Sequence, residues 1–289
     1  MNSPKFVLGI GSQRAGTTLL YKILDECTSI FMHPVKELHF FDSLYGVRNP
    51  EFLMKFSERQ VEREVEKLFV ENDHVYIKDE RYKCYLRANW ILSRQSIREI
   101  QYLDLFWPCV ANNKIIGEIT PEYMIVPERG IKHMSEVVGQ DAPIILLSRD
   151  PVERFISSFK LLKLYGTDDT TVDNFEFELR RVLLEMPDWV EHQRQLSDFA
   201  TALTNYGKYF KNICFIKFED LSQNFSAVAD EIEKTLDVPI DRSKAATILK
   251  NKINKIGETD SLGPETLEVL RDTFRRETED LHHIHSLSI

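Results

Sequence analysis

The feature that most constrains the fold is an apolar run that leads through a glycine-rich loop into an amphipathic segment. Residues 6–10 read Phe-Val-Leu-Gly-Ile, which is typical of a buried strand. The loop GSQRAGTT, residues 11–18, follows directly, and apolar residues then recur at helical spacing from Thr17 to about Cys27. A helix that begins at such a loop presents backbone amides to an anion. The order predicts an α/β fold with a phosphate-binding turn.

Further apolar runs repeat the buried-strand pattern at residues 114–117, 143–147 and 212–218. Near-continuous apolar strands are typical of parallel sheets that are covered on both faces. After the second run, Asp150 is a candidate helix N-cap and Pro151 occupies the first helical position. We predict a P-loop-like, three-layer α/β fold with a central, mostly parallel sheet flanked by helices.

The chain is long enough for one large domain. It has 289 residues, of which 43% are hydrophobic, and it contains no internal repeat or low-complexity linker. We therefore expect a single domain over 1–289 with a mostly helical insertion at about 42–113. Within the insertion we expect one buried helix face, formed by Val61, Val65, Leu68 and Phe69.

Charge and cysteine content exclude several classes of function. The 37 Lys+Arg and 46 Asp+Glu give a net charge of −9, which opposes sequence-independent binding to nucleic acid or anionic membranes. No run approaches the roughly 18 apolar residues of a membrane span, and no signal peptide is recognisable. We expect a cytoplasmic protein without a membrane span. The cysteines are scattered, which favours thiols over disulfides or a zinc site: Cys27, Cys84, Cys109 and Cys214.

The phosphate loop lacks the lysine of a nucleotide-hydrolysing P-loop. Gly11 and Gly16 have the P-loop spacing, but Thr17 stands at the lysine position, Thr18 keeps a hydroxyl, and the cation is Arg14. Transfer of a γ-phosphoryl group depends on that lysine and on magnesium. A sulfuryl group carries less negative charge, so amides, hydroxyls and a cationic side chain could stabilise its transfer without a metal. An ordinary glycine turn is the alternative reading.

Two more motifs make the pattern specific. KELHFFD at 36–42 and LSRDPVERFISSF at 147–159, together with the loop at 11–18, closely resemble the sulfotransferases that use 3′-phosphoadenosine 5′-phosphosulfate (PAPS). The resemblance is greatest to the branch that contains heparan sulfate sulfotransferases and their bacterial relatives. It covers residues 5–42 and 114–160 and is weaker through about the last 80 residues. It implies transfer of a sulfuryl group to an acceptor hydroxyl, with release of 3′-phosphoadenosine 5′-phosphate (PAP).

The resemblance also implies which residues bind the cofactor. Arg149 and Ser157, eight residues apart in the RDPxxRxxS pattern, would bind the 3′-phosphate. Lys252 is a candidate to cover the cofactor, with a solvated basic loop as the alternative. The 5′-phosphosulfate would lie on the first loop, at Arg14, Ala15, Gly16, Thr17 and Thr18.

The motif ExHFFD implies the catalytic groups. Glu37 would be the base that takes the acceptor proton, and His39 would support it. Burial beside the pair at 40–41 would raise the pKa of Glu37. Lys36 or Arg14 would stabilise charge on the leaving group. The alternatives are that Glu37 is a surface carboxylate paired with Lys36, and that His39 is a hydrogen-bonded neighbour of the base.

Departures from the family pattern bear on the acceptor. Ile119 in GEITPEY stands where polysaccharide-modifying members often carry a lysine, and their C-terminal disulfide loop is missing. With the negative net charge, this favours a neutral small molecule, lipid or sugar over a heparin-like polyanion, with the insertion shaping its pocket. A cluster at His282, His283 and His285 is expected to be a frayed tail, and no metal site is predicted. The rival functions are a P-loop kinase or NTPase and a non-catalytic nucleotide-binding scaffold.

Overall fold

The central layer is a parallel β-sheet. The computed structural model describes residues 4–70, 79–111, 114–166, 175–250 and 262–287. Within them the strands pair in the order β2-β3-β1-β4-β5, and every neighbouring pair is parallel. The predicted parallel sheet is confirmed. The strand bounds are β1 Lys5–Gly11, β2 Phe31–Met32, β3 Ile115–Ile119, β4 Ile144–Ser148 and β5 Ile213–Lys217.

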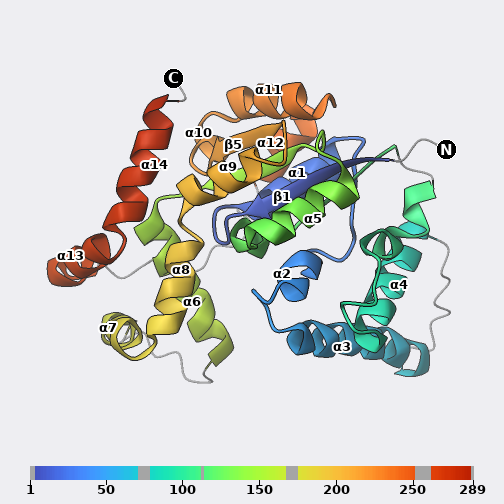
Figure 1. Ribbon diagram of the computed structural model, residues 1–289, viewed down its shortest axis with the longest axis horizontal. Coiled ribbons are helices and arrows are strands. Elements are labelled where there is room, and N and C mark those ends of the chain that lie inside the picture. Colours follow the sequence, from blue (N-terminus) through green and yellow to red (C-terminus); the bar gives the residue numbers. More distant parts are fainter. Residues whose placement is uncertain (1–3, 71–78, 112–113, 167–174, 251–261, 288–289) are drawn as a thin grey trace.

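Helices cover both faces of the sheet, which makes the three layers (Figure 1). Alternate residues of β1 point to opposite faces. Leu8 packs with α5 (Glu128–Val138) and α9 (Phe199–Gly207), whereas Val7 packs with the other layer. That layer comprises α1 (Thr17–Cys27), α11 (Phe225–Leu236) and α12 (Arg242–Lys250). Because both faces are covered, β4 is buried over its whole length, which explains its continuous apolar run.

The described part of residues 42–113 is helical and joins β2 to β3. Its buried helix face differs from the expected one, because α3 buries Leu53 and Ser57 while Val65 is exposed. The side chains of Leu68 and Phe69, which belong to the expected face, lie outside the described residues. The buried side of α3 continues with Gln60, which accepts a hydrogen bond from Tyr85 of α4 at 3.2 Å. The elements are α2 Phe40–Leu44, α3 Pro50–Val70, α4 Glu80–Arg94, η1 Tyr102–Phe106 and η2 Cys109–Ala111.

A third apolar cluster lies among the helices that follow β4 and near the C-terminus. Asp150 caps α6, because its carboxylate accepts a hydrogen bond from the amide of Glu153 at 2.9 Å, as predicted. Two pairs of consecutive late helices are separated by single residues, α10 and α11 by Asn224, and α13 and α14 by Phe274. The remaining elements are η3 Pro121–Ile125, α6 Pro151–Gly166, α7 Phe175–Glu185, α8 Pro187–Gln195, α10 Asp220–Gln223, α13 Pro264–Thr273 and α14 Arg275–Leu287.

The expectation of a frayed tail is wrong. The three histidines lie within α14, which continues to Leu287 and packs along α9. His285 forms a hydrogen bond with the Ser148 hydroxyl at 3.2 Å and stacks near Phe215, so tertiary contacts order this helix.

Two further expectations can be compared with the described segments. All four cysteines lie within them as buried thiols, and none forms a disulfide there. No helix in these segments combines the length and apolar character that crossing a bilayer requires.

Candidate active site

The glycine-rich loop lies at the carboxyl edge of the sheet, between β1 and α1. Gly16 has φ 88°, a left-handed conformation that glycine adopts without strain. A Cβ there would lie only 2.8 Å from the ring of Phe218, so the fold also leaves no room for a side chain. The amide of Ser12 donates to the carbonyl of Leu147 at 2.9 Å, which fixes the loop to the end of β4. The N-terminus of α1 is thereby placed as an anion-binding site of the kind that P-loops use.

The structure brings the first and third motifs together. The Nε of Arg14 donates to the Ser157 hydroxyl at 3.0 Å, and Nη1 of Arg149 donates to the carbonyl of Arg14 at 3.0 Å. The Arg149 guanidinium also lies over the ring of Phe218, 4.9 Å from its centroid. The predicted 5′ and 3′ halves of the cofactor site are therefore adjacent. Lys252 lies outside the described residues.

Arg154 contacts the phosphate loop from the buried side, and the sequence analysis did not identify it. Its side chain is fully buried and donates to the Ser197 hydroxyl at 2.8 Å and to Gln193 Oε1 at 3.1 Å. It also reaches the carbonyl of Gln13 in the loop at 3.5 Å. Burial, reinforced by the nearby charge of Arg149, lowers the pKa of Arg154 to about 9. Arg154 is the second arginine of the RDPxxR motif, and this was the sequence signal that could have identified it. Its buried cation joins α6 and α8 to the loop.

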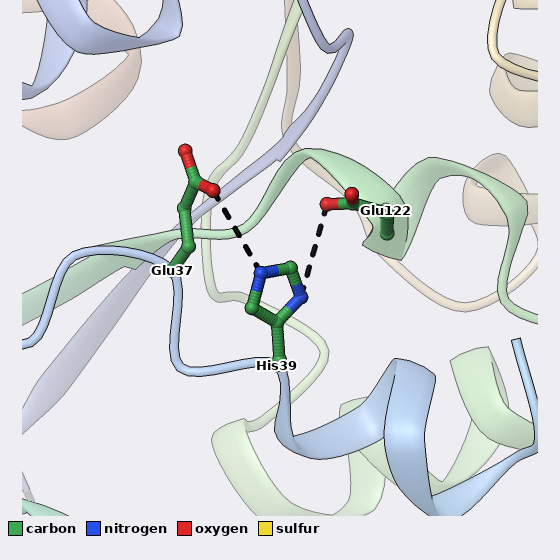
Figure 2. A group of neighbouring side chains, drawn as sticks. All are labelled: Glu37, His39 and Glu122. Atoms are coloured by element: carbon green, nitrogen blue, oxygen red, sulfur yellow. Dashed lines mark ion pairs between the residues drawn. The ribbon is translucent and has the colours of Figure 1, made fainter. Parts of the chain in front are cut away.

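The second motif forms a tight loop before α2, with Glu37 and His39 both at positive φ. Lys36 Nζ pairs with Glu37 Oε1. This contact was expected under the alternative in which Glu37 is a surface carboxylate. His39 Nδ1 lies 2.6 Å from Asp42 Oδ2. The Nε2 atom of His39 lies 3.7 Å from Glu37 Oε2 (Figure 2). The motif thus places one carboxylate on each side of the imidazole.

A buried carboxylate on β3 holds this loop in place. Glu118 accepts hydrogen bonds from the hydroxyls of Tyr102 at 2.7 Å, Tyr123 at 2.8 Å and Thr120 at 2.7 Å. The Tyr123 hydroxyl in turn accepts from the amide of Phe40 at 3.2 Å. Burial raises the pKa of Glu118, although its three donors oppose this. The loop conformation therefore depends on residues more than 60 positions further along the chain.

The expected rise in the pKa of Glu37 is wrong. Burial alone would raise it, but the interactions with His39 and with the Lys36 ammonium outweigh burial and lower the pKa to about 2. The rings expected to desolvate Glu37 pack instead into the core, where Phe41 lies 4.8 Å from Tyr102. The Glu37 side chain stays 30% exposed. Glu37 is therefore an ionised carboxylate at neutral pH.

His39 has the opposite shift. Burial would lower its pKa, but the hydrogen bond with Asp42 and the ion pair with Glu37 raise it to about 10. An imidazolium has no free lone pair and cannot accept a proton. The charge state supports the reading in which His39 assists and Glu37 is the base.

Two residues that sequence reasoning missed complete the site. Glu122 of η3 accepts a hydrogen bond from Gln13 Nε2 at 3.3 Å, and its other oxygen lies 3.8 Å from His39 Nδ1. Arg48, which follows α2, lies 3.8 Å from Glu122. Glu122 belongs to the quoted GEITPEY segment, whereas no sequence signal marked Arg48. Three cations balance three carboxylates in this cluster: Lys36, His39 and Arg48 with Glu37, Asp42 and Glu122.

The group Glu37, His39 and Glu122 could be considered as metal ligands, since one donor atom from each lies within 4.8 Å of the others. Figure 2 shows, however, that the two carboxylates approach different nitrogens of the ring. A metal ion needs the neutral imidazole. The arrangement suits a hydrogen-bonded chain through a charged His39.

Fold and site together define an α/β protein with a candidate anion-binding site at the start of a helix. The profile of the sulfotransferase family matches residues 4–242, so the chain belongs to this family and is a sulfotransferase. This favours the sulfotransferase over the P-loop kinase. No protein of curated function matches the chain in a sequence comparison.

Solved structures of sulfotransferases resemble this fold. One is the sulfotransferase from Alicyclobacillus acidocaldarius, with a TM-score of 0.56 and 17% identity over 98% of this chain and 96% of that chain. Another is the sulfotransferase domain of the olefin synthase from Synechococcus PCC 7002, with a TM-score of 0.47 and 20% identity over 99% and 96%. The first likeness supports the P-loop-like fold.

Proposed function

We propose that the chain uses PAPS as its sulfuryl donor and transfers the group to a hydroxyl of a neutral acceptor. The observation that carries the proposal is the contact of Arg14 with both Ser157 and Arg149, which places the phosphate loop beside the 3′-phosphate motif. The 5′-phosphosulfate would lie on the amides that begin α1, and Arg149 would bind the 3′-phosphate together with Ser157.

The transfer is an in-line displacement at sulfur. The acceptor oxygen forms a bond to sulfur while the bond from sulfur to the bridging oxygen of the 5′-phosphate breaks, and PAP leaves with that electron pair. Glu37 takes the acceptor proton, and His39 donates to Glu37 and stays charged. Lys36 neutralises Glu37 in the free protein. When Lys36 turns to the sulfuryl oxygens, Glu37 becomes more basic and the group in transfer gains a cation.

The acceptor preference follows from the charge of the site. Its three cations are matched by three carboxylates, so the catalytic cluster lacks the positive excess that a polyanion would need. Asp42 and Arg48 both come from the insertion at about 42–113 and both reach the catalytic cluster. We therefore assign the acceptor side to the insertion, as part of a single domain. The likeness to the heparan sulfate branch would then reflect shared catalytic residues and not a shared acceptor.

Calorimetric titration with PAP tests cofactor use directly. We expect binding of PAP without magnesium and weaker binding of adenosine 5′-phosphate, which lacks the 3′-phosphate. Incubation with labelled PAPS and a metabolite extract, followed by mass spectrometry, would identify the acceptor. Glu37→Gln should abolish sulfate transfer while the affinity for PAP is retained. No binding of PAP, or magnesium-dependent turnover of ATP in its place, would refute the proposal.

A further inference from the structure

Glu122 lies where three separate segments meet. It follows β3 and is 7% exposed. One carboxylate oxygen accepts a hydrogen bond from Gln13 of the phosphate loop at 3.3 Å and lies 3.8 Å from Arg48. The other oxygen lies 3.8 Å from His39 Nδ1. Glu122 is therefore in contact with both the loop of the first motif and the histidine of the second.

The contact with His39 acts through charge. Asp42 already accepts the hydrogen bond from Nδ1 of His39 at 2.6 Å. The oxygen of Glu122 that lies nearer to His39 is buried and has no hydrogen-bond partner in the described part of the chain. Two carboxylates on the Nδ1 side require a proton on that nitrogen. The proton on Nε2 is then directed at Glu37, 3.7 Å away on the opposite side of the ring.

We propose that Glu122 is a further positioning residue for sulfuryl transfer, which keeps His39 charged and oriented toward Glu37 and links this pair to Gln13 of the phosphate loop. The role in transfer rests on the proposed function, whereas the effect on His39 is a property of the free protein. The charged groups that face His39 are Glu37, Asp42 and Glu122, and Lys36 and Arg48 pair with the first and last of these.

The linkage has a functional consequence. Glu122 contacts both Gln13, in the loop that would hold the phosphosulfate, and His39, which assists the base. A shift of Gln13 on cofactor binding therefore moves Glu122 and changes the electrostatic field at His39. Burial also raises the pKa of Glu122, against the opposing charge of His39.

The test is an NMR titration of His39 in nitrogen-15-labelled protein, with its resonances assigned by their loss in His39→Gln. The unsubstituted protein should titrate near pH 10. Glu122→Gln removes one charge near Nδ1 and should lower that midpoint by about one to three pH units. Arg48→Met removes the cation beside Glu122 and should raise the midpoint of His39. Glu122→Asp keeps the negative charge, so its midpoint should lie close to that of the unsubstituted protein. Glu128→Gln, a distant exposed carboxylate on α5, is the matched control and should change nothing.

The outcomes separate this inference from the proposed function. Equal midpoints in Glu122→Gln and Glu128→Gln, or shifts of the same sign in Glu122→Gln and Arg48→Met, would overturn it even if the enzyme transfers sulfate. The expected shifts would support it even if PAP failed to bind. In an active enzyme, the alkaline limb of the pH profile of kcat/KM should move with the NMR midpoint. Arg48 is partly exposed, so its variant tests the sign of the effect should Glu122→Gln not fold.

Discussion

Gly16 is the position where the fold of the phosphate loop is most sensitive to one added methyl group. Its φ of 88° costs an L-residue about 1–2 kcal/mol. The new Cβ would also lie 2.8 Å from Phe218 Cδ2 and 3.3 Å from Leu221 Cδ1, and overpacking of this kind costs about 1–3 kcal/mol. Gly16→Ala should therefore lower the free energy of unfolding by about 2–5 kcal/mol, or Tm by about 3–8 °C.

Gly46 provides a matched control. It also has a positive φ, 79°, but no heavy atom lies within 4 Å of the position of its Cβ. Gly46→Ala should carry only the backbone cost of about 1–2 kcal/mol, which lowers Tm by about 2–3 °C. Thermal and urea unfolding of both variants would measure the difference.

The displaced ring connects stability to binding. Phe218 lies beneath the Arg149 guanidinium, so moving the ring also moves the group assigned to the 3′-phosphate. Calorimetry should show a lower affinity for PAP in Gly16→Ala and an unchanged affinity in Gly46→Ala. Equal losses of Tm in the two variants would refute the argument from packing, and an unchanged affinity in Gly16→Ala would refute the placement of the cofactor.

Two other predictions follow from the same site. Ser157→Ala removes a hydroxyl assigned to the 3′-phosphate and should weaken PAP binding about tenfold or more while leaving adenosine 5′-phosphate unaffected, so an equal loss for both nucleotides would contradict the assignment. His39 has a pKa of about 10 in the folded protein against about 6.5 unfolded, so its stabilising charge is fully present below about pH 6.5 and is lost as the pH rises through about 10. Glu37, with its lowered pKa of about 2, contributes above about pH 4.5 and loses this as the pH falls through about 2. The Tm difference between the unsubstituted protein and His39→Gln should be largest near about pH 5–6 and small above about pH 10. A Tm difference that does not change with pH would show that His39 is uncharged.

Much of the fold could be predicted because the signals are local. Apolar runs of strand length at 6–10, 114–117 and 143–147 predicted β1, β3 and β4, and the parallel pairing followed from their burial on both faces. The glycine spacing at 11–16 predicted the turn into α1. The buried face of α3 was predicted wrongly where the structure describes it, because the helix turns Leu53 and Ser57 inward and leaves Val65 exposed.

The candidate site was predictable only in part. Arg14, Arg149 and Ser157 were identified by motif, and the structure brings them together. Glu122 and Arg154 lie within sequence segments that the analysis quoted. Nothing in those segments distinguished them chemically until the structure showed their neighbours. Arg48 lay outside every motif.

The order of residues alone predicted which side chains could do sulfuryl chemistry, because residue type and spacing along one strand, loop or helix are properties of a short segment. Only the tertiary structure decided how those side chains are charged. The groups that shift the pKa values of Glu37 and His39 lie mostly within residues 36–42, but their distances are set by a loop with two positive φ values that is held through Tyr123 and Glu118, and Glu122 is brought beside His39 from η3. Electrostatic interactions follow distance through space, and that distance exists only once the sheet has assembled.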